Sequence, residues 1–161
     1  PDGWLIYAKE HTMQWLKSGV GFFPDKYRGF YGQMAKIKNV RLVPVETNSY
    51  DLINFSQAVA TITGTVGWEA ILRSKPTVIF GYPWYKDCPA LFKVNDAVSC
   101  RQALAEIKNG FKVDQQKIIN YLKSFDEAAV RCYMSPSVGE GSGLSKSESI
   151  ANITQAILKE L

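Results

Sequence analysis

The sequence predicts an α/β domain built around a mainly parallel β-sheet. Short apolar runs alternate with segments of helical pattern along most of the chain, which is typical of strands joined by crossover helices. Residues 58–85 show this best, because a strand, a small-residue turn, a helix and a second strand follow one another there. The chain has 161 residues and is 46% apolar, which is enough for one domain with a sizeable core.

The elements expected in the first half follow from the apolar runs and the residues that interrupt them. The run 4–8 predicts a buried strand, residues 26–36 a helix, and residues 40–43 a second strand that Pro44 closes. Asn48 or Ser49 can cap a short helix that continues to Phe55. The remaining elements of this half are a strand at 58–62, a helix at 66–73 and a strand at 77–80.

The second half reads mainly as helix. Residues 92–94 predict a short edge strand, Ser99 is expected to cap a helix near 103–108, and Asp114 to cap the helix after it. Residues 135–145, rich in Ser and Gly, indicate a flexible connection. The predicted organisation is therefore a domain at 1–134, this connection, and a C-terminal amphipathic helix at 146–161.

Charge and composition exclude several classes of function. The net charge of +4 is spread along the chain without a basic stripe interleaved with stacking aromatics, so no nucleic-acid partner is expected. No apolar stretch approaches the roughly 20 residues of a membrane span, and no secretory signal is visible. Three widely spaced cysteines indicate reduced thiols in a cytosolic setting and no zinc site. Because the chain starts at Pro1 without an initiator Met, we expect it to be a fragment of a longer protein.

The turn formed by Thr63, Gly64 and Thr65 is the first candidate for function. Gly64 permits close backbone approach, the two threonines carry hydroxyl groups, and the helix that follows begins with N–H groups that it does not use itself. A phosphate group would suit this position. The alternative is that Gly64 serves only a tight turn and Thr65 only caps the helix, and the local pattern leaves both open.

Two further residues and one loop are candidates. Glu69, one helical turn later, could bind ribose hydroxyls or simply favour the first turn of the helix. His11, the only histidine, follows the first strand beside Lys9 and could contact an anion or move a proton, or be an ordinary polar loop residue. The aromatic loop 82–85 could stack on a base, cover a sugar, or form a packed apolar cap.

The run from Thr63 to Pro76, continued by residues 80–85, resembles the capsular-polysaccharide biosynthesis glycosyltransferases, the group that includes the β-Kdo transferases. Lys9, Glu10 and His11 resemble the K-x-H-P element of that group, with Thr12 in place of the proline. The resemblance implies a GT-B enzyme with two facing Rossmann-like domains, of which this chain looks like the C-terminal, donor-binding one.

The resemblance also implies roles for single residues. Gly64 and Thr65 would hold the donor phosphate and Glu69 the ribose, while His11 with Lys9 would bind a phosphate or the carboxylate of an acidic sugar. His11 is the catalytic candidate. The full set expected to bind the donor is Lys9, His11, Thr63, Gly64, Thr65, Glu69 and Tyr85.

The expected ligand is a nucleotide sugar, with a CMP-sugar such as CMP-Kdo favoured over a UDP-sugar, and no bound metal or other cofactor is expected. The acceptor, a glycan or glycolipid, would be held by an N-terminal domain outside this chain. The expected location is cytoplasmic, with peripheral association at the inner face of the membrane. Two alternatives remain: a domain similar to UDP-sugar 2-epimerases, and a non-catalytic module that docks a partner protein through its aromatic loop and final helix.

Overall fold

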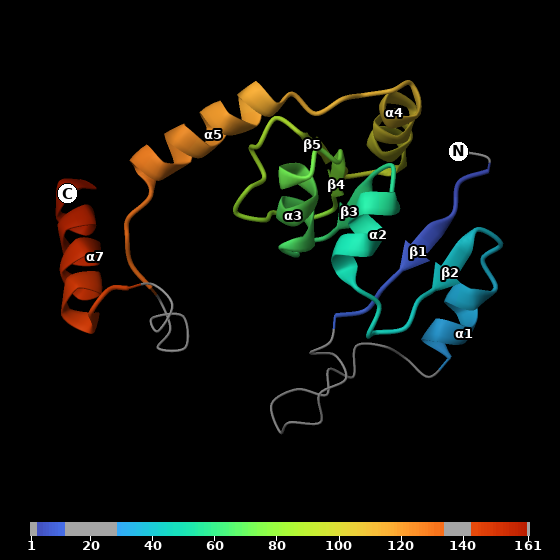
Figure 1. Cartoon of the computed structure of the whole chain (residues 1–161), viewed down its shortest axis with the longest axis horizontal. Coiled ribbons are helices and arrows are strands. Elements are labelled where there is room, and N and C mark those ends of the chain that lie inside the picture. The colour runs from blue at the N-terminus through green and yellow to red at the C-terminus, as the bar shows by residue number, and fades with distance from the viewer. Residues whose placement is uncertain (1–2, 12–28, 134–142, 161) are drawn as a thin grey trace. The chain divides into compact units, whose positions relative to one another are not determined.

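The computed structural model describes residues 3–11, 29–133 and 143–160 (Figure 1). The chain divides into two compact units, Pro1–Ile118 and Ile119–Leu161. The domain limits expected from the sequence stay a prediction, because most of the connection at 135–145 lies outside the described residues. The start of the helix expected at 26–36 lies outside them as well.

The strands of the first unit form two parallel sheets. In the first sheet β1 (Ile6–Ala8) pairs with β2 (Val40–Leu42). The second sheet has the order β3-β4-β5, in which β3 (Val59–Thr61) and β5 (Leu91–Lys93) flank the central strand β4 (Thr77–Ile79). The predicted α/β class with parallel strands is thereby confirmed. The strands were expected in one sheet, whereas no strand pairing joins β1 to β3 within the described ranges.

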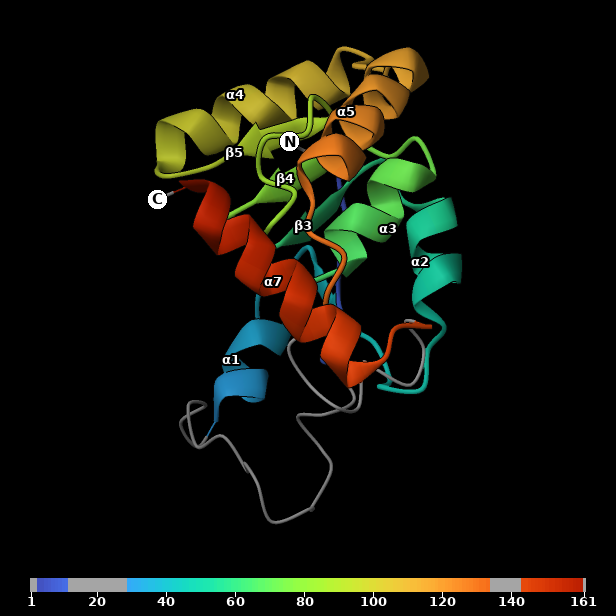
Figure 2. The ribbon, with the colours of Figure 1, turned by 90° about the vertical axis from the view of Figure 1, so that its left-hand side faces the viewer.

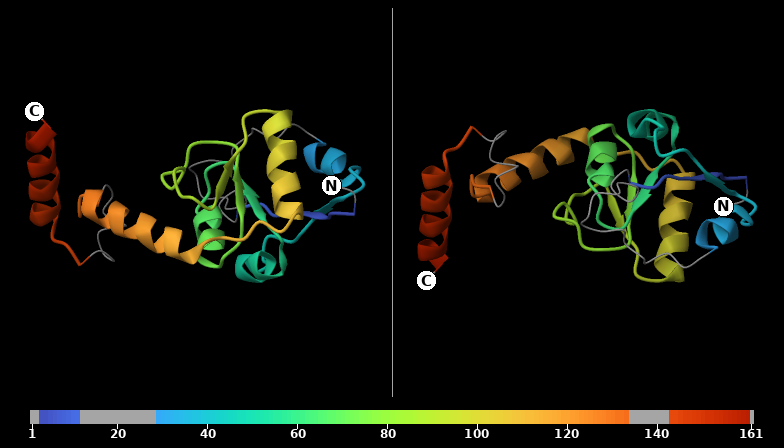
Figure 3. Two further views of the ribbon diagram at one scale, coloured as in Figure 1. Left: turned by 90° about the horizontal axis from the view of Figure 1, so that it is seen from above. Right: turned by 90° about the horizontal axis from the view of Figure 1, so that it is seen from below.

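The three-stranded sheet is covered by a helix on each face. Thr77 of β4 donates a hydrogen bond to the Gly67 carbonyl of α3 (Val66–Leu72), whereas Val78 packs against α4 (Ala97–Lys108). Because successive side chains of a strand point to opposite faces, α3 and α4 lie on opposite sides of β4, as Figure 3 shows. This layered arrangement is that of a Rossmann-like domain.

The core of the first unit surrounds β4, which is buried along its whole length. The cluster on the α4 side consists of Val78, Val94, Ala103 and Ile107. On the other side α3 contributes Ala70 and Ile71, both fully buried. Packing on both faces fixes the position of β4, and therefore also the position at which the loop after β4 begins.

The first unit also contains two shorter helices, α1 (Phe30–Ala35) and α2 (Ser49–Phe55), which are labelled in Figure 2. Asn48 caps α2 as expected, because its side chain accepts a hydrogen bond from the Tyr50 amide at 2.8 Å. The expectation that Ser99 caps the next helix is wrong. Asp96 is the N-cap of α4, and Ser99 is its reciprocal partner three residues later in a capping box.

The remaining helices that the structure describes are α5 (Gln115–Ala128) and α7 (Lys146–Glu160). Within the second unit, the Ser149 hydroxyl of α7 accepts a hydrogen bond from the Tyr133 amide at 3.0 Å. The Asn152 side chain donates to the Arg131 carbonyl at 2.8 Å. These two bonds join α7 to the segment that follows α5. In the described residues no helix is both long and apolar enough to cross a membrane.

Candidate functional site

The turn after β3 is closed by its own backbone and by Thr61. The Thr61 hydroxyl accepts a hydrogen bond from the Gly64 amide at 3.1 Å, and the Gly64 carbonyl accepts one from the Gly67 amide at 3.2 Å. A Cβ atom on Gly64 would lie 2.9 Å from the Thr61 hydroxyl oxygen. The turn therefore needs glycine at this position, while Thr63, Gly64 and Thr65 are all exposed to solvent.

Tyr85 lies beneath this turn and supports it. Its side chain is fully buried, and its hydroxyl donates a hydrogen bond to the Gly64 carbonyl. Burial raises the pKa of Tyr85, opposed by a hydrogen bond from the Trp68 backbone, and the negative charge of Glu69 raises it further. The hydroxyl thus stays protonated and connects the turn to the first turn of α3.

Gly67 allows Tyr85 to approach this closely. A Cβ atom at Gly67 would overlap the Tyr85 hydroxyl and would also lie 3.0 Å from the Thr61 methyl carbon and 3.1 Å from that of Thr77. Neither Gly67 nor Thr61 is among the site residues predicted from the sequence. Glycine in the first turn of a helix is destabilising because it loses more conformational entropy on folding than other residues. Its presence there indicates a position at which another group approaches the backbone closely.

Some amide groups at the start of α3 already have partners in the fold. The Gly64, Gly67 and Glu69 amides donate to Thr61, Gly64 and Thr65 respectively. The amides of Thr65 and Val66 make no hydrogen bond within the described part of the chain. Thr65 occupies the N-cap position, but its side chain makes no capping bond. Two amides at this end of α3 thus have no partner in the described part of the fold, and the two threonines beside them are exposed to solvent.

The aromatic loop after β4 divides into a buried part and an exposed part. The ring centroids of Trp84 and Trp68 are 4.9 Å apart, and those of Trp84 and Tyr85 are 5.3 Å apart. Trp84 remains 51% exposed and Tyr82 83% exposed. Tyr85 therefore belongs to the base of the turn, whereas Trp84 and Tyr82 offer aromatic surface to solvent.

Lys9 and His11 follow β1, which pairs with β2 in the two-stranded sheet. The Lys9 ammonium group lies 3.4 Å from the Glu10 carbonyl oxygen, and His11 is exposed. The structure brings Tyr85 and Glu69 together with residues 63–65, and it places Lys9 and His11 on the other sheet. Thr12, which stands where the resembling family has proline, lies outside the described residues.

Within residues 3–11, 29–133 and 143–160, no group of three or more His, Cys, Asp or Glu side chains lies close enough together to hold a metal ion. The chemistry offered near the turn is that of hydrogen-bond donors, one partly buried carboxylate and aromatic surface. These groups suit a polar ligand that carries an anionic group and a ring.

The chain is similar to known capsule proteins. It is 28% identical over 132 residues to the capsule polysaccharide modification protein LipA of Neisseria meningitidis serogroup B, and the matched region is 81% of this chain and 18% of that protein. The protein of the same name from serogroup A is 31% identical over 71 residues, 44% of this chain and 10% of the relative. The chain thus spans less than a fifth of the length of these relatives. No solved structure matches it.

The family comparison covers more of the chain. The model of the capsule polysaccharide biosynthesis protein family matches residues 1–105, from before β1 into α4. The match therefore includes the turn, Tyr85 and the Lys9 to His11 segment, and it covers well over half of the sequence. On this ground the chain belongs to the capsule polysaccharide biosynthesis protein family.

Proposed function

We propose that this chain is the donor-binding part of a GT-B glycosyltransferase that assembles capsule polysaccharide. The observation that carries the proposal is the exposed turn at residues 63–65, which Tyr85 supports from below inside the segment that the family match covers. A turn supported in this way is pre-organised, so little conformational entropy is lost when a ligand binds.

The proposed ligand is a nucleotide sugar, with CMP-Kdo or a related CMP-sugar favoured. Its phosphate would accept hydrogen bonds from the Thr65 and Val66 amides and from the threonine hydroxyls. Glu69, in the first turn of α3, would accept hydrogen bonds from the ribose, and the exposed face of Trp84 would stack on the base. No part of this arrangement needs a bound metal.

Lys9 and His11 are proposed to act on the sugar side of the donor. Lys9 would bind a phosphate or carboxylate oxygen, and His11 would hold or move a proton at the reacting centre. Transfer itself needs an acceptor, a glycan or glycolipid, which we propose is held by a further domain of the longer protein. We place the reaction on the cytoplasmic side of the membrane, where nucleotide sugars would reach the site.

Calorimetric titration of the chain with CMP, UDP and GDP tests the proposal. We expect CMP to bind, and Glu69→Gln to weaken binding by about 1–3 kcal/mol through loss of charge-assisted hydrogen bonds to the ribose. Glu106→Gln on α4, an exposed carboxylate away from the turn, is the matched control and should leave the affinity unchanged.

Two results would count against the proposal. A folded sample that binds none of the three nucleotides would contradict it outright. A clear preference for UDP, together with conversion of a UDP-sugar, would favour the alternative of a domain similar to 2-epimerases.

The role of His11 is tested by comparing the binding of CMP and of CMP-Kdo to a His11→Gln variant. If His11 contacts the sugar, the substitution lowers the affinity for CMP-Kdo and leaves the affinity for CMP unchanged.

A further inference from the structure

A second polar feature lies at the carboxyl ends of β4 and β5. A hollow of about 130 Å³ is lined by Ile79, Gly81, Tyr82, Lys86, Lys93 and Asn95. Pockets that enclose whole ligands measure roughly 300–1,000 Å³, so this hollow suits one chemical group of a ligand. It contains two lysines and no acidic residue in its lining, which gives it a positive character.

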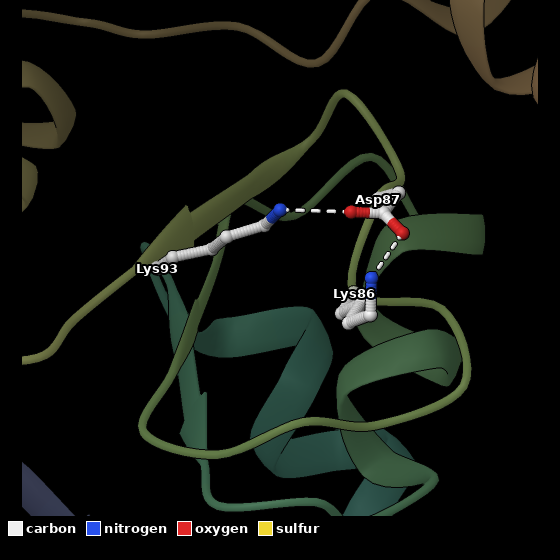
Figure 4. Close-up of polar contacts among 3 residues, drawn as sticks. All are labelled: Lys86, Asp87 and Lys93. Carbon is white, nitrogen blue, oxygen red and sulfur yellow. Dashed lines mark hydrogen bonds and ion pairs between the residues drawn. The ribbon is translucent and has the colours of Figure 1, made fainter.

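The two lysines converge on a single carboxylate. The Lys93 ammonium group, which reaches out from β5, lies 2.9 Å from one oxygen of Asp87, and that of Lys86 lies 2.5 Å from the other (Figure 4). Hydrogen bonds from Lys86, and then from Lys93, hold the pKa of Asp87 below its usual value. The cluster carries one net positive charge, and the carboxylate offsets the repulsion between the two ammonium groups.

Stability of the fold does not account for this cluster. The side chains of Lys86, Lys93 and Asp87 are 44%, 55% and 60% exposed, and ion pairs this exposed contribute little to stability. The same exposure leaves both ammonium groups accessible to an anion from solvent. Such an anion could take over the hydrogen bonds that Asp87 accepts.

Gly81 connects this hollow to the turn after β3. A Cβ atom on Gly81 would lie 3.0 Å from the Ile62 carbonyl oxygen and 3.0 Å from the Thr63 methyl carbon. The backbone of the hollow is therefore in contact with the backbone that leads into residues 63–65. Gly81, which lines the hollow, therefore lies beside the residues at which the turn begins.

We propose that this hollow is an anion subsite, in which Lys86 and Lys93 bind a phosphate or carboxylate group. In the absence of that anion, Asp87 forms ion pairs with both ammonium groups. Asn95, two residues after the end of β5, adds an amide side chain that can donate or accept a hydrogen bond. Anion binding follows from the cluster itself. Its assignment to the phosphate or the sugar carboxylate of a nucleotide sugar rests on the proposed function.

Calorimetric titration with inorganic phosphate, CMP and free Kdo at low ionic strength tests the subsite. Loss of both charges in Lys86→Gln/Lys93→Gln should weaken binding of at least one of these anions by about tenfold. The control Lys108→Gln/Lys112→Gln removes the same charge from exposed positions outside the hollow and should bind like the parent chain. Loss with Kdo alone assigns a carboxylate, and loss with CMP and phosphate assigns the nucleotide phosphate.

Asp87→Asn separates binding from a purely structural ion pair. If Asp87 competes with the ligand, its neutralisation frees both ammonium groups, and anion affinity rises while the lysine variants lower it. Equal affinities of the lysine double variant and its control for all three anions would overturn the proposal. So would a decrease in affinity in Asp87→Asn, with thermal unfolding used to verify that each variant is folded.

The two proposals fail in different ways. If phosphate or Kdo binds through the lysines and no nucleotide binds at all, the anion subsite stands and the donor-binding function is wrong. If CMP binds with an affinity that depends on Glu69 and not on the lysines, while phosphate and Kdo bind alike in the double variant and control, the function stands and the subsite is wrong.

Discussion

The Tyr85 hydroxyl donates a hydrogen bond to the Gly64 carbonyl and so joins the loop after β4 to the turn after β3, across 21 residues of sequence. The ring is fully buried and packs beside Trp84 and Trp68. This hydrogen bond is costly to lose, because a buried hydroxyl group has given up its contacts with water and depends on the carbonyl as its acceptor. The conformation of the exposed turn therefore depends on a residue that solvent does not reach.

Tyr85→Phe should lower the stability of the fold and loosen the turn. Removal of the hydroxyl leaves the Gly64 carbonyl without this partner, so we expect a loss of about 1–3 kcal/mol in the free energy of unfolding. Urea denaturation measures this loss. Tyr82→Phe, at an exposed position of the same loop, should change stability by less than about 0.5 kcal/mol. Equal stability of the two variants would show that the hydrogen bond contributes nothing.

Gly67→Ala should destabilise the protein more than a usual helix substitution. The new methyl group would overlap the Tyr85 hydroxyl and crowd the methyl groups of Thr61 and Thr77, and overpacking of this kind costs about 1–3 kcal/mol. Gly32→Ala in α1 is the matched control, because nothing lies within 4 Å of its Cβ position. That change should stabilise by about 0.5–1 kcal/mol through the helix preference of alanine.

The double variant Gly67→Ala/Tyr85→Phe tests the cause of that loss. Without the hydroxyl, the new methyl group has more room, so the two changes should destabilise by less than the sum of their separate effects. Strict additivity in the urea titrations would mean that Gly67 is required for a reason other than its contact with Tyr85.

Much of this fold can be predicted from local sequence, because apolar periodicity and turn residues act over short distances. The order of strands and helices from β1 to α4 follows from such signals, as does the Asn48 cap. Ser99 is a good capping residue, but so is Asp96 three residues earlier, and residue type alone does not choose between them. The reciprocal hydrogen bonds between Asp96 and Ser99 show which residue is the N-cap, and these bonds cannot be read from a sequence pattern.

The base of the site could not be predicted in this way. The contact between Tyr85 and Gly64 depends on β3 and β4 lying side by side in parallel, and the aromatic loop alone does not show which ring turns inward. The Lys86, Asp87 and Lys93 cluster likewise depends on the pairing of β4 with β5. The exposed turn was predictable because glycine and threonine mark it locally, whereas its support is tertiary.

Lys75 should prove to be a structural residue in spite of its place in the run that resembles the glycosyltransferase family. Its ammonium group donates to the carbonyls of Asn54 and Ser56 at 2.8 and 2.9 Å, at the C-terminal end of α2. These bonds satisfy carbonyls that the helix leaves without partners, and a cation there is favoured by the helix dipole. We expect Lys75→Gln to cost about 1–2 kcal/mol in urea unfolding.

Lys112→Gln, at an exposed position outside the helices, serves as its control and should leave stability unchanged. Lys75→Arg should keep part of the effect, since a guanidinium group can still donate to these carbonyls. If Lys75→Gln weakens CMP binding without any loss of stability, Lys75 acts on the ligand, and the structural role is wrong.

Asp96 should make the stability of the protein depend on pH in the acid range. The Ser99 amide and then the Ser99 hydroxyl donate to its carboxylate, at 2.7 and 2.8 Å, and these bonds lower the pKa of Asp96 from its ordinary value of 3.8. A lowered pKa means that the ionised carboxylate stabilises the folded state. This contribution is fully present above the unfolded-state pKa and is lost as the pH falls through the lower folded-state value.

Asp96→Asn keeps a capping side chain that does not titrate. The difference in thermal unfolding midpoint between the two proteins should therefore be constant near neutral pH and change only below about pH 4. Parallel loss of stability in both proteins on acidification would show that the titration of Asp96 is not linked to folding.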